Sequence, residues 1–274
     1  MLFNKINIFA IWLITLGISV VSIILIGGYT RISDSGLSIT EWLPISGILY
    51  PMSETSWKIE FNKYKMIDEF MLVNSSMNIA EFKVIYFWEW FHRAFARLIG
   101  LIYIIPLIYL IISKNIPKGY YLNVLLIGLL LVIQAIVGWY MVKSGLTDRV
   151  DVSQYRLSLH LAIAFIILGL IFYSLLRFIY GDKINEDLIV QNKLLLTLFI
   201  LIFFQILYGA FVSGTDSGLL YNTWPLYNGN ISPGNLIIQN SYLYSFFENK
   251  EFILFFHRTF AFILLFVLMY LNFI

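Results

Sequence analysis

Long apolar runs separated by short polar segments dominate the chain. The first run extends from Ile6 to Ile26, and later runs begin near Phe91, Tyr121, Leu157, Leu194 and Phe252. An α-helix rises ~1.5 Å per residue, so ~20 apolar residues cross the ~30 Å of hydrocarbon in a bilayer. The pattern therefore predicts an all-α polytopic membrane protein with six spanning helices. The first run is too long for a signal peptide, and no small-residue cleavage site follows it, so we expect it to be retained.

The polar segment between the first two runs, about Gly28–Trp90, is longer than a simple connection requires. Within it Trp57, Phe61 and Tyr64 recur at helical spacing among charged residues. This spacing predicts an amphipathic helix lying in the membrane interface, with an ordinary surface helix as the alternative. Asn78 with a glutamate three residues later predicts a capping box, so the second spanning helix should begin outside the membrane.

Composition agrees with a membrane protein and removes several function classes. The chain is 60% hydrophobic and 12% charged, whereas a soluble domain has roughly 25% charged residues. Its net charge of +2 and lack of a long basic run argue against a nucleic-acid partner. The absence of cysteine excludes disulfides, thiolate metal sites, iron–sulfur clusters and thiol nucleophiles. Metal chemistry would therefore need histidine, carboxylate or a prosthetic group.

The short loops predict the orientation of the spans. Lys114, Lys118 and Arg177 fall on the side that also holds the N-terminus, which favours a cytoplasmic placement of that side. Lys143 and Arg156 on the opposite side weaken this signal. Most tryptophans fall on the opposite side as well. We therefore expect a multi-pass protein of the cell inner (plasma) membrane, with a cytoplasmic N-terminus and its working surface at the outer face.

Two blocks of sequence occur twice in the same order. Residues Gly27–Trp42 align without gaps on Gly209–Trp224, sharing the first glycine, the DSGL block and the final tryptophan. The stretch FHRAFA at Phe91–Ala96 matches FHRTFA at Phe256–Ala261. Two ordered matches indicate a duplicated unit of four spans.

The repeat predicts two halves. Residues 1–180 would form an N-terminal four-helix bundle with a long outer loop, and residues 190–274 the first two helices of a C-terminal bundle. Applying the spacing of the repeat to His160 predicts a fourth histidine near position ~325 in two further spans, beyond this sequence.

The three histidines, His92, His160 and His257, each open an apolar run. Paired neutral imidazoles on facing helices are the axial ligands that six-coordinate haem iron needs. For a single histidine, a side chain at a helix mouth reaching toward water is the alternative. A bare metal ion is disfavoured because each half would offer two histidines and no second carboxylate.

Arginines accompany the histidines. Arg93 and Arg258 directly follow His92 and His257, and Arg97 lies one turn further along. A guanidinium at the aqueous rim can pair with a haem propionate, so these three are candidates for that role. Ordinary interfacial anchoring is the alternative, and it explains Arg97 less easily.

Glu89 distinguishes the two halves. It precedes His92 by three residues and so shares its helix face. The matching stretch of the second half has Leu254 and Phe255, without a carboxylate. Glu89 can therefore accept a proton during oxidation of a haem substituent in the first half. The alternative is that it only pairs with Arg93 at i, i+4.

Together these motifs resemble haem A synthase, specifically its cysteine-free branch with a long first outer loop. The resemblance covers essentially all of residues 20–274 and is carried by EWFHRAFARLIG, GGYTRISDSGLSITEWLPISG, QAIVGWYMVKSGL with VSQYRLSLHL, and DSGLLYNTWPL. The family implies eight spans in two four-helix halves. It also implies successive hydroxylations that convert the C8 methyl of haem o to the formyl group of haem a, for terminal cytochrome oxidase.

The resemblance also implies roles for residues. His92 and His160 would hold the substrate haem o, and Glu89 matches the essential carboxylate of the family. His257 matches one axial ligand of a haem b cofactor, whose second ligand belongs to spans that this sequence does not include. The cysteine pair of another branch is absent, so no thiol step carries over.

Two other functions remain open from the sequence. A cytochrome b-type electron-transfer protein would use both haems as carriers, but it has no need for one asymmetric carboxylate. A transporter or haem chaperone would favour broken helices or polar residues at mid-membrane. No dinucleotide or P-loop motif is present, so an external electron carrier is expected as a partner. Haem O synthase, as the source of substrate, and the lipid bilayer are the other expected partners, and homo-oligomer formation is left open.

Overall fold

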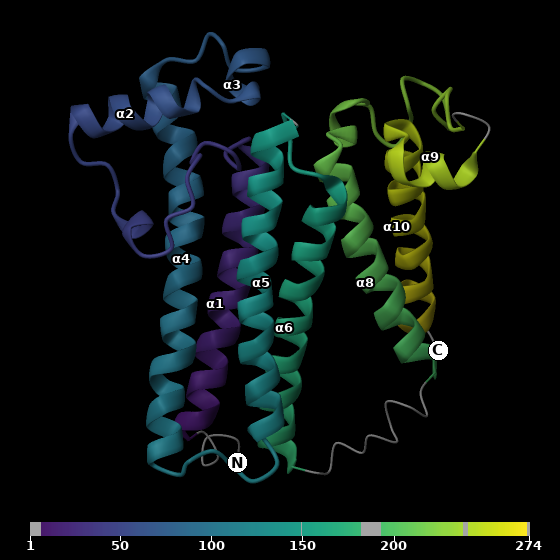
Figure 1. The fold of residues 1–274 in the computed structure, drawn as a ribbon. Coiled ribbons are helices and arrows are strands. Elements are labelled where there is room, and N and C mark those ends of the chain that lie inside the picture. Colours follow the sequence, from purple (N-terminus) through teal and green to yellow (C-terminus); the bar gives the residue numbers. More distant parts are fainter. Residues whose placement is uncertain (1–6, 149, 182–192, 238–240, 273–274) are drawn as a thin grey trace. The chain divides into compact units, whose positions relative to one another are not determined.

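The computed structural model describes residues 7–148, 150–181, 193–237 and 241–272 (Figure 1). The long helices are α1 (Ile8–Ile32), α4 (Ile79–Ile112), α5 (Tyr121–Asp148), α6 (Gln154–Tyr180), α8 (Lys193–Gly214) and α10 (Lys250–Asn272). In the described ranges, six helices are long and apolar enough to cross a membrane, and no strand is assigned. Both the six spans and the all-α class are confirmed.

The described residues fall into two compact units. The first contains the chain up to Val152 together with α6 from Ala162 onward. The second contains Ser153–Leu161, the opening turns of α6, with the described residues from Lys193 onward. The predicted division between residues 180 and 190 falls mainly on residues outside the described ranges, as does the predicted start of the first span at Ile6. The division into halves stays a prediction.

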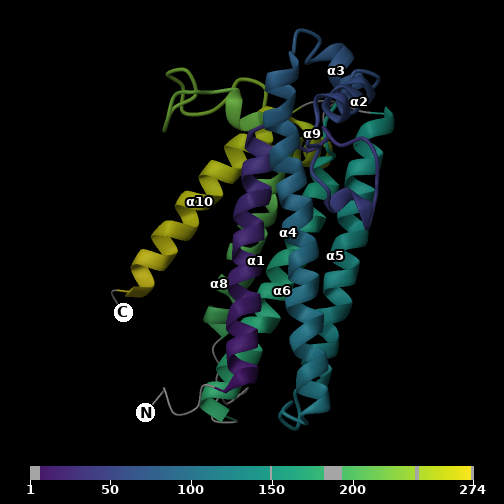
Figure 2. The same cartoon turned by 90° about the vertical axis from the view of Figure 1, so that its left-hand side faces the viewer.

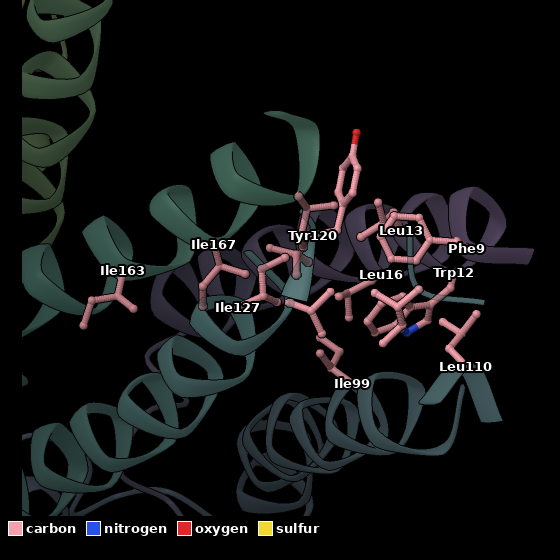
Figure 3. Packing of buried hydrophobic residues seen from close by; sticks show 14 residues of the cluster. Phe9, Trp12, Leu13, Leu16, Ile99, Leu110, Tyr120, Ile127, Ile163 and Ile167 are labelled. Atoms are coloured by element: carbon pink, nitrogen blue, oxygen red, sulfur yellow. The ribbon is translucent and has the colours of Figure 1, made fainter. Parts of the chain in front are cut away.

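In the first unit α1, α4, α5 and the later part of α6 run alongside one another (Figures 1 and 2). Their core is aliphatic and aromatic, with Phe9, Leu13, Leu16, Ile127 and Ile167 almost fully buried (Figure 3). Lipid tails are as apolar as these side chains, so close packing and interhelical hydrogen bonds hold such bundles together. Two of these bonds tie neighbouring helices here: Trp12 Nε1 donates to the Ile102 carbonyl at 2.9 Å, and Tyr103 Oη to the Val124 carbonyl at 2.8 Å.

The second spanning helix begins outside the predicted hydrocarbon, as expected. The Asn78 side chain accepts from the backbone N–H groups of Ala80 and Glu81, while Glu81 Oε2 accepts from the Asn78 N–H at 2.9 Å. This is a complete capping box, and it starts α4 at Ile79. The first three turns of α4 therefore project beyond the apolar run that begins at Phe91.

Packing against this projecting part of α4 contradicts the prediction of an interfacial helix. Helix α2 (Glu54–Tyr64) forms as expected, and the short α3 (Asp68–Leu72) follows it. However, the apolar face of α2 is buried by protein. Its residues Trp57, Phe61 and Tyr64 pack in one cluster with Phe82, Ile85 and Tyr86 of α4. The prediction was wrong because helical spacing reveals an apolar face but not what covers it, and the aromatic start of α4 lies within reach.

The second unit is built around α8, α9 (Tyr242–Glu248) and α10. Tyr208, Phe211 and Ile253 form its buried cluster, with phenylalanines of α8, α9 and α10 packed around them. The opening turns of α6 join this unit through Ser158, whose hydroxyl donates to the Leu207 carbonyl at 3.1 Å. Tyr155 donates to Glu248 of α9 at 2.5 Å.

Candidate functional site

Glu89 lies on α4 with its carboxylate buried, 3% exposed, and fully engaged. Its Oε1 accepts from Arg93 Nη2 at 2.5 Å. Its Oε2 accepts from the Ser38 hydroxyl at 2.6 Å and from the Ile39 backbone N–H at 2.8 Å. A buried carboxylate needs such donors to stay charged. The ion pair with Arg93 that the sequence offered as an alternative is present, and the catalytic role of Glu89 stays a prediction.

Ser38 is the residue of this site that the sequence interpretation missed. It is buried, 2% exposed, and separated by 51 positions along the chain from the carboxylate that it binds. The repeat contained a signal for this residue. Ser38 aligns with Leu220 in one repeated block, and Glu89 aligns with Leu254 beside the other. Two polar residues in one copy that are both leucine in the other indicate a polar pair.

The arginines of α4 bind the loop that follows α1. Arg93 donates from Nη2 to the Ile39 carbonyl at 3.1 Å and from Nη1 to the Glu41 carbonyl at 3.2 Å. Arg97 donates from Nε to the Pro44 carbonyl at 2.9 Å. These bonds leave other N–H groups on each guanidinium, so pairing with a haem propionate stays a prediction.

His92 lies against α1 at Gly27. A Cβ placed on Gly27 would stand 3.1 Å from His92 Nε2, closer than ordinary contact allows. A glycine at this position therefore lets the imidazole approach the α1 backbone. The first glycine of the repeated block thus has a physical reason in the first unit.

The second unit repeats this contact. A Cβ on Gly209 of α8 would stand 3.1 Å from Cε1 of the His257 ring on α10. Gln205, one turn earlier on α8, places its Nε2 3.1 Å from His257 Nδ1 and donates to the His257 carbonyl at 3.0 Å. The sequence interpretation did not single out Gln205, although a lone glutamine in the apolar run after Leu194 was a signal.

The arginine contacts are repeated as well. Arg258 donates from Nη2 to the Tyr221 carbonyl at 3.2 Å and from Nη1 to the Thr223 carbonyl at 3.5 Å. Tyr221 and Thr223 align with Ile39 and Glu41, the two carbonyls that Arg93 binds. The two copies of the repeat therefore share two structural features. One is the contact between a glycine and a histidine, and the other is an arginine that binds two carbonyls of the preceding loop, here called the arginine clasp.

The two copies differ at the carboxylate. Leu254 occupies the position of Glu89 and is buried, 2% exposed, while Leu220 replaces Ser38. Glu251, six residues before His257, is engaged with the loop through the Tyr221 hydroxyl at 2.9 Å and the Asn235 N–H at 2.8 Å. The position one turn before the histidine is thus acidic in the first unit and apolar in the second.

A cleft of about 270 Å³ opens beside Arg93 in the first unit. Its walls come from the loop at Ile39–Trp42, from Arg93, and from the end of α5 at Trp139–Leu146. The Arg93 guanidinium lies over the Trp42 ring at 5.7 Å, and Lys143 Nζ over the Trp139 ring at 5.1 Å. The cleft is thus lined by two cations, two indoles and Glu41, whose carboxylate pairs with Lys63 at 2.9 Å.

His160 lies in the part of α6 that belongs to the second compact unit, whereas His92 belongs to the first. Whether the two imidazoles hold one haem therefore stays a prediction. Among the described residues, no group of three or more histidine, cysteine or acidic side chains gathers as a metal ion would require.

The types of residue around His257 suit a histidine that ligates haem iron. The imidazole is partly buried beside a glycine, and Gln205 Oε1 is a buried acceptor with no hydrogen-bond partner. Axial histidines usually have a polar group that orients the ring nitrogen not bound to the metal. Gln205 would take that role for His257 with its amide turned so that Oε1, an acceptor, faces the ring N–H in place of Nε2.

These observations define a class of protein first: a multi-pass helical membrane protein whose repeated units each pack a histidine against a glycine. Comparison with known proteins then places it in a family. A family model described as cytochrome oxidase assembly protein, COX15-CtaA, matches residues 10–274. The chain belongs to this family.

Similar proteins include the haem A synthase of Parvibaculum lavamentivorans, 41% identical over 93% of this chain and 74% of the relative. That of Pelagibacter ubique is 42% identical over 99% of this chain and 80% of the relative. The haem A synthase of Wolbachia pipientis is 41% identical over 93% of this chain and 78% of the relative. No solved structure matches the chain. The similarity to haem A synthases that the motifs indicated is confirmed.

Proposed function

We propose that this chain acts as a haem A synthase, a membrane oxidoreductase that converts the C8 methyl of haem o to the formyl group of haem a. Family membership and the names of its relatives support an enzyme of haem a formation. In this proposal the product serves terminal cytochrome oxidase. Haem O synthase supplies the substrate within the inner membrane, and the haem sites lie near the outer face, with the N-terminus cytoplasmic.

The observation that carries the proposal is the asymmetry between two otherwise matched frameworks. Both units have the glycine–histidine contact and the arginine clasp, but only the first has the buried Glu89–Ser38 pair. A protein that only carries electrons through two haems would gain nothing from a buried carboxylate beside one of them. An oxidation at one haem edge requires a group that accepts protons there.

The residues of the predicted N-terminal half, residues 1–180, have defined tasks in this proposal. His92 and His160 ligate the substrate haem, and Glu89 accepts a proton released as the methyl substituent is oxidised. Arg93 and Ser38 hold the Glu89 carboxylate on the face of α4 that His92 shares. The remaining N–H groups of Arg93 and Arg97 pair with propionates.

The second unit holds the cofactor in this proposal. His257 would ligate haem b, Gln205 would contact the His257 ring, and Arg258 would pair with a propionate. Haem b would supply one-electron transfer there, and an external electron carrier is the expected partner.

The test is the haem content of the Glu89→Gln variant. The full chain is co-expressed with haem O synthase, and the extracted haems are identified by mass. We expect wild type to yield haem a, and Glu89→Gln to retain haem o while haem a falls about 100-fold or more, since an amide keeps the shape but cannot take a proton.

Ser38→Ala is the matched control. It removes one hydrogen bond to the carboxylate and leaves the acid in place, so we expect a smaller loss of haem a. A normal haem a yield from Glu89→Gln would remove this residue from the mechanism. Unmodified haem from the wild type would instead favour the electron-transfer alternative.

A further inference from the structure

A short apolar segment, Leu43–Leu49, returns along the side of α4 after the chain has left the first bundle. In Figures 1 and 2 it is the dark-blue stretch before α2, and it descends beside α4. It contains the single 3₁₀ turn η2 (Ser46–Ile48). Its sequence, LPISGIL, has no charged side chain.

Side chains of α4 hold the backbone of this segment. Arg97 donates from Nε to the Pro44 carbonyl at 2.9 Å and from Nη2 to the Leu43 carbonyl at 3.0 Å. Trp90 Nε1 donates to the Ile48 carbonyl at 3.0 Å. Turn hydrogen bonds of 3.1 to 3.3 Å use further backbone groups within the segment. Irregular backbone is tolerated at membrane depth only when its polar groups are satisfied by protein in this way.

The register of α4 gives the depth of the segment. Helix α4 ends at Ile112, and Lys114 and Lys118 follow in the next loop, which marks one face of the membrane. At ~1.5 Å per residue, Arg97 lies ~22 Å and Trp90 ~33 Å from that end, against ~30 Å of hydrocarbon. Trp90 thus marks the opposite edge, where tryptophan is enriched. The carbonyls that Arg97 binds lie at or below this edge.

The outward side chains of the segment are large, apolar and uncovered. Ile45 is 87% exposed and Leu49 76% exposed, so no described residue packs over them. On α4, Leu98 lies level with Arg97 and Leu101 about one turn deeper, and both are also exposed, at 45% and 49%. The carbonyls of Leu43, Pro44, Ile45, Ser46 and Ile48 all accept hydrogen bonds within the protein. Exposed apolar side chains on such a segment at hydrocarbon depth match one environment, the acyl chains of lipid.

We propose that Leu43–Leu49 is a membrane-dipping segment that places Ile45 among lipid acyl chains and Leu49 at the membrane edge beside Trp90, with Arg97 holding the backbone at that depth. The bilayer is then a partner of this outer loop as well as of the spanning helices. Residues 39–42, directly before the segment, form a wall of the cleft beside Arg93. The proposed lipid-contacting segment is therefore continuous in sequence with one wall of that cleft.

The test uses the absence of cysteine from the chain. Ile45→Cys in the full chain is labelled with a nitroxide and placed in phosphatidylcholine vesicles, and the accessibility of the label to oxygen and to a soluble nickel chelate is measured. Leu101→Cys on α4 is the lipid reference. Met66→Cys, at a residue 78% exposed just after α2, is the water reference. The readout needs neither haem nor activity.

We expect the Ile45 label to be accessible to oxygen and protected from nickel, as at Leu101. Adding Arg97→Gln should raise its nickel accessibility several-fold toward the value at Met66, with the Leu101 label unchanged as a check on folding. Nickel accessibility at Ile45 equal to that at Met66 in the parent would show a loop in water and overturn the proposal. Protection from both reagents would show cover by protein, such as a second copy of the chain, and would also overturn it.

Discussion

At the scale of single residues, the site is organised by donors that face backbone carbonyls. Arg93 and Arg258 each bind two carbonyls, two residues apart, in the loop after the preceding helix. The planar guanidinium suits this task because its N–H groups are fixed in a fork, whereas a lysine offers a point charge on a flexible stem. Holding the loop in this way fixes it against the helix that carries the neighbouring histidine.

The two glycines give a paired prediction. Gly27→Ala should displace the His92 ring, and Gly209→Ala the His257 ring, since each Cβ would stand 3.1 Å from a ring atom. Crowding of this kind costs about 1–3 kcal/mol. Haem spectra of the purified variants should show the ligation of one site altered and that of the other kept.

Gly28→Ala is the control for this pair, because a Cβ there meets nothing within 4 Å. It should leave both haem signals unchanged. Equal effects of Gly27→Ala on both sites would show that the glycine acts on the whole fold and not on its own histidine.

At the scale of elements, the segment formed by α2 and α3 (Glu54–Leu72), here called the α2–α3 cap, carries a buried acid. Glu69 of α3 is 7% exposed, and its Oε2 has no hydrogen-bond partner. Burial is the largest cause that raises the pKa of Glu69, to about 8, and nearby Glu89, Asp151 and Asp34 raise it further. Tyr64 acts in the opposite direction through a hydrogen bond. At pH values between the ordinary pKa of 4.5 and the folded value of about 8, the folded cap therefore holds a proton on Glu69 that the unfolded chain releases.

This pKa predicts a pH-dependent stability of the cap. The ordinary pKa is 4.5 and the folded value is about 8, so the folded state binds more protons in between. The free energy of cap opening should fall as pH rises through this window, by at most ~1.4 kcal/mol per unit, and level off above it. Glu69→Gln should remove the slope, so hydrogen exchange of α2 and α3 at pH 8 should be slower than in wild type.

The two proteins should exchange alike near pH 4.5, where both carry a neutral side chain at position 69. Asp68→Asn, at the exposed neighbouring position, should retain the wild-type slope. A slope that survives in Glu69→Gln would assign the pH dependence to another group.

At the scale of the whole molecule, the chain uses one framework twice and alters it once. The glycine–histidine contact and the arginine clasp recur, while the acidic pair Glu89–Ser38 becomes Leu254 and Leu220. The two units therefore share these contacts and differ at two residues that touch each other in the first unit.

The assignment of haems to halves gives a prediction at this scale. His92→Ala or His160→Ala should lose substrate haem o while haem b remains, because each removes one axial nitrogen from the first site. In a protein that also carries the predicted fourth histidine, His257→Ala should lose haem b and keep haem o. Extraction and quantification of both haems from each variant measure this directly. Loss of haem b alone from His92→Ala would reverse the assignment.

Much of the architecture could be predicted because a bilayer permits few solutions. Hydrocarbon offers no hydrogen-bond partners, so each apolar run long enough to cross had to be a helix. The capping box at Asn78 was predictable because it is a local interaction over three residues. The repeat also placed the histidines at matched positions, and each ring does lie against the matched glycine.

Other features required the tertiary structure because they join distant parts of the chain. Periodicity showed an apolar face on α2, but only the fold put that face on α4 and not on lipid. Composition marked Glu89 and Arg97 as unusual, but only the fold brought Ser38 to the carboxylate and the Leu43 and Pro44 carbonyls to the guanidinium. The sequence by itself thus determined which segments cross the membrane and where ionisable groups enter it, since hydrocarbon sets those rules locally. The tertiary structure decided which partners satisfy those groups, since hydrogen bonds depend on distances that no local pattern records.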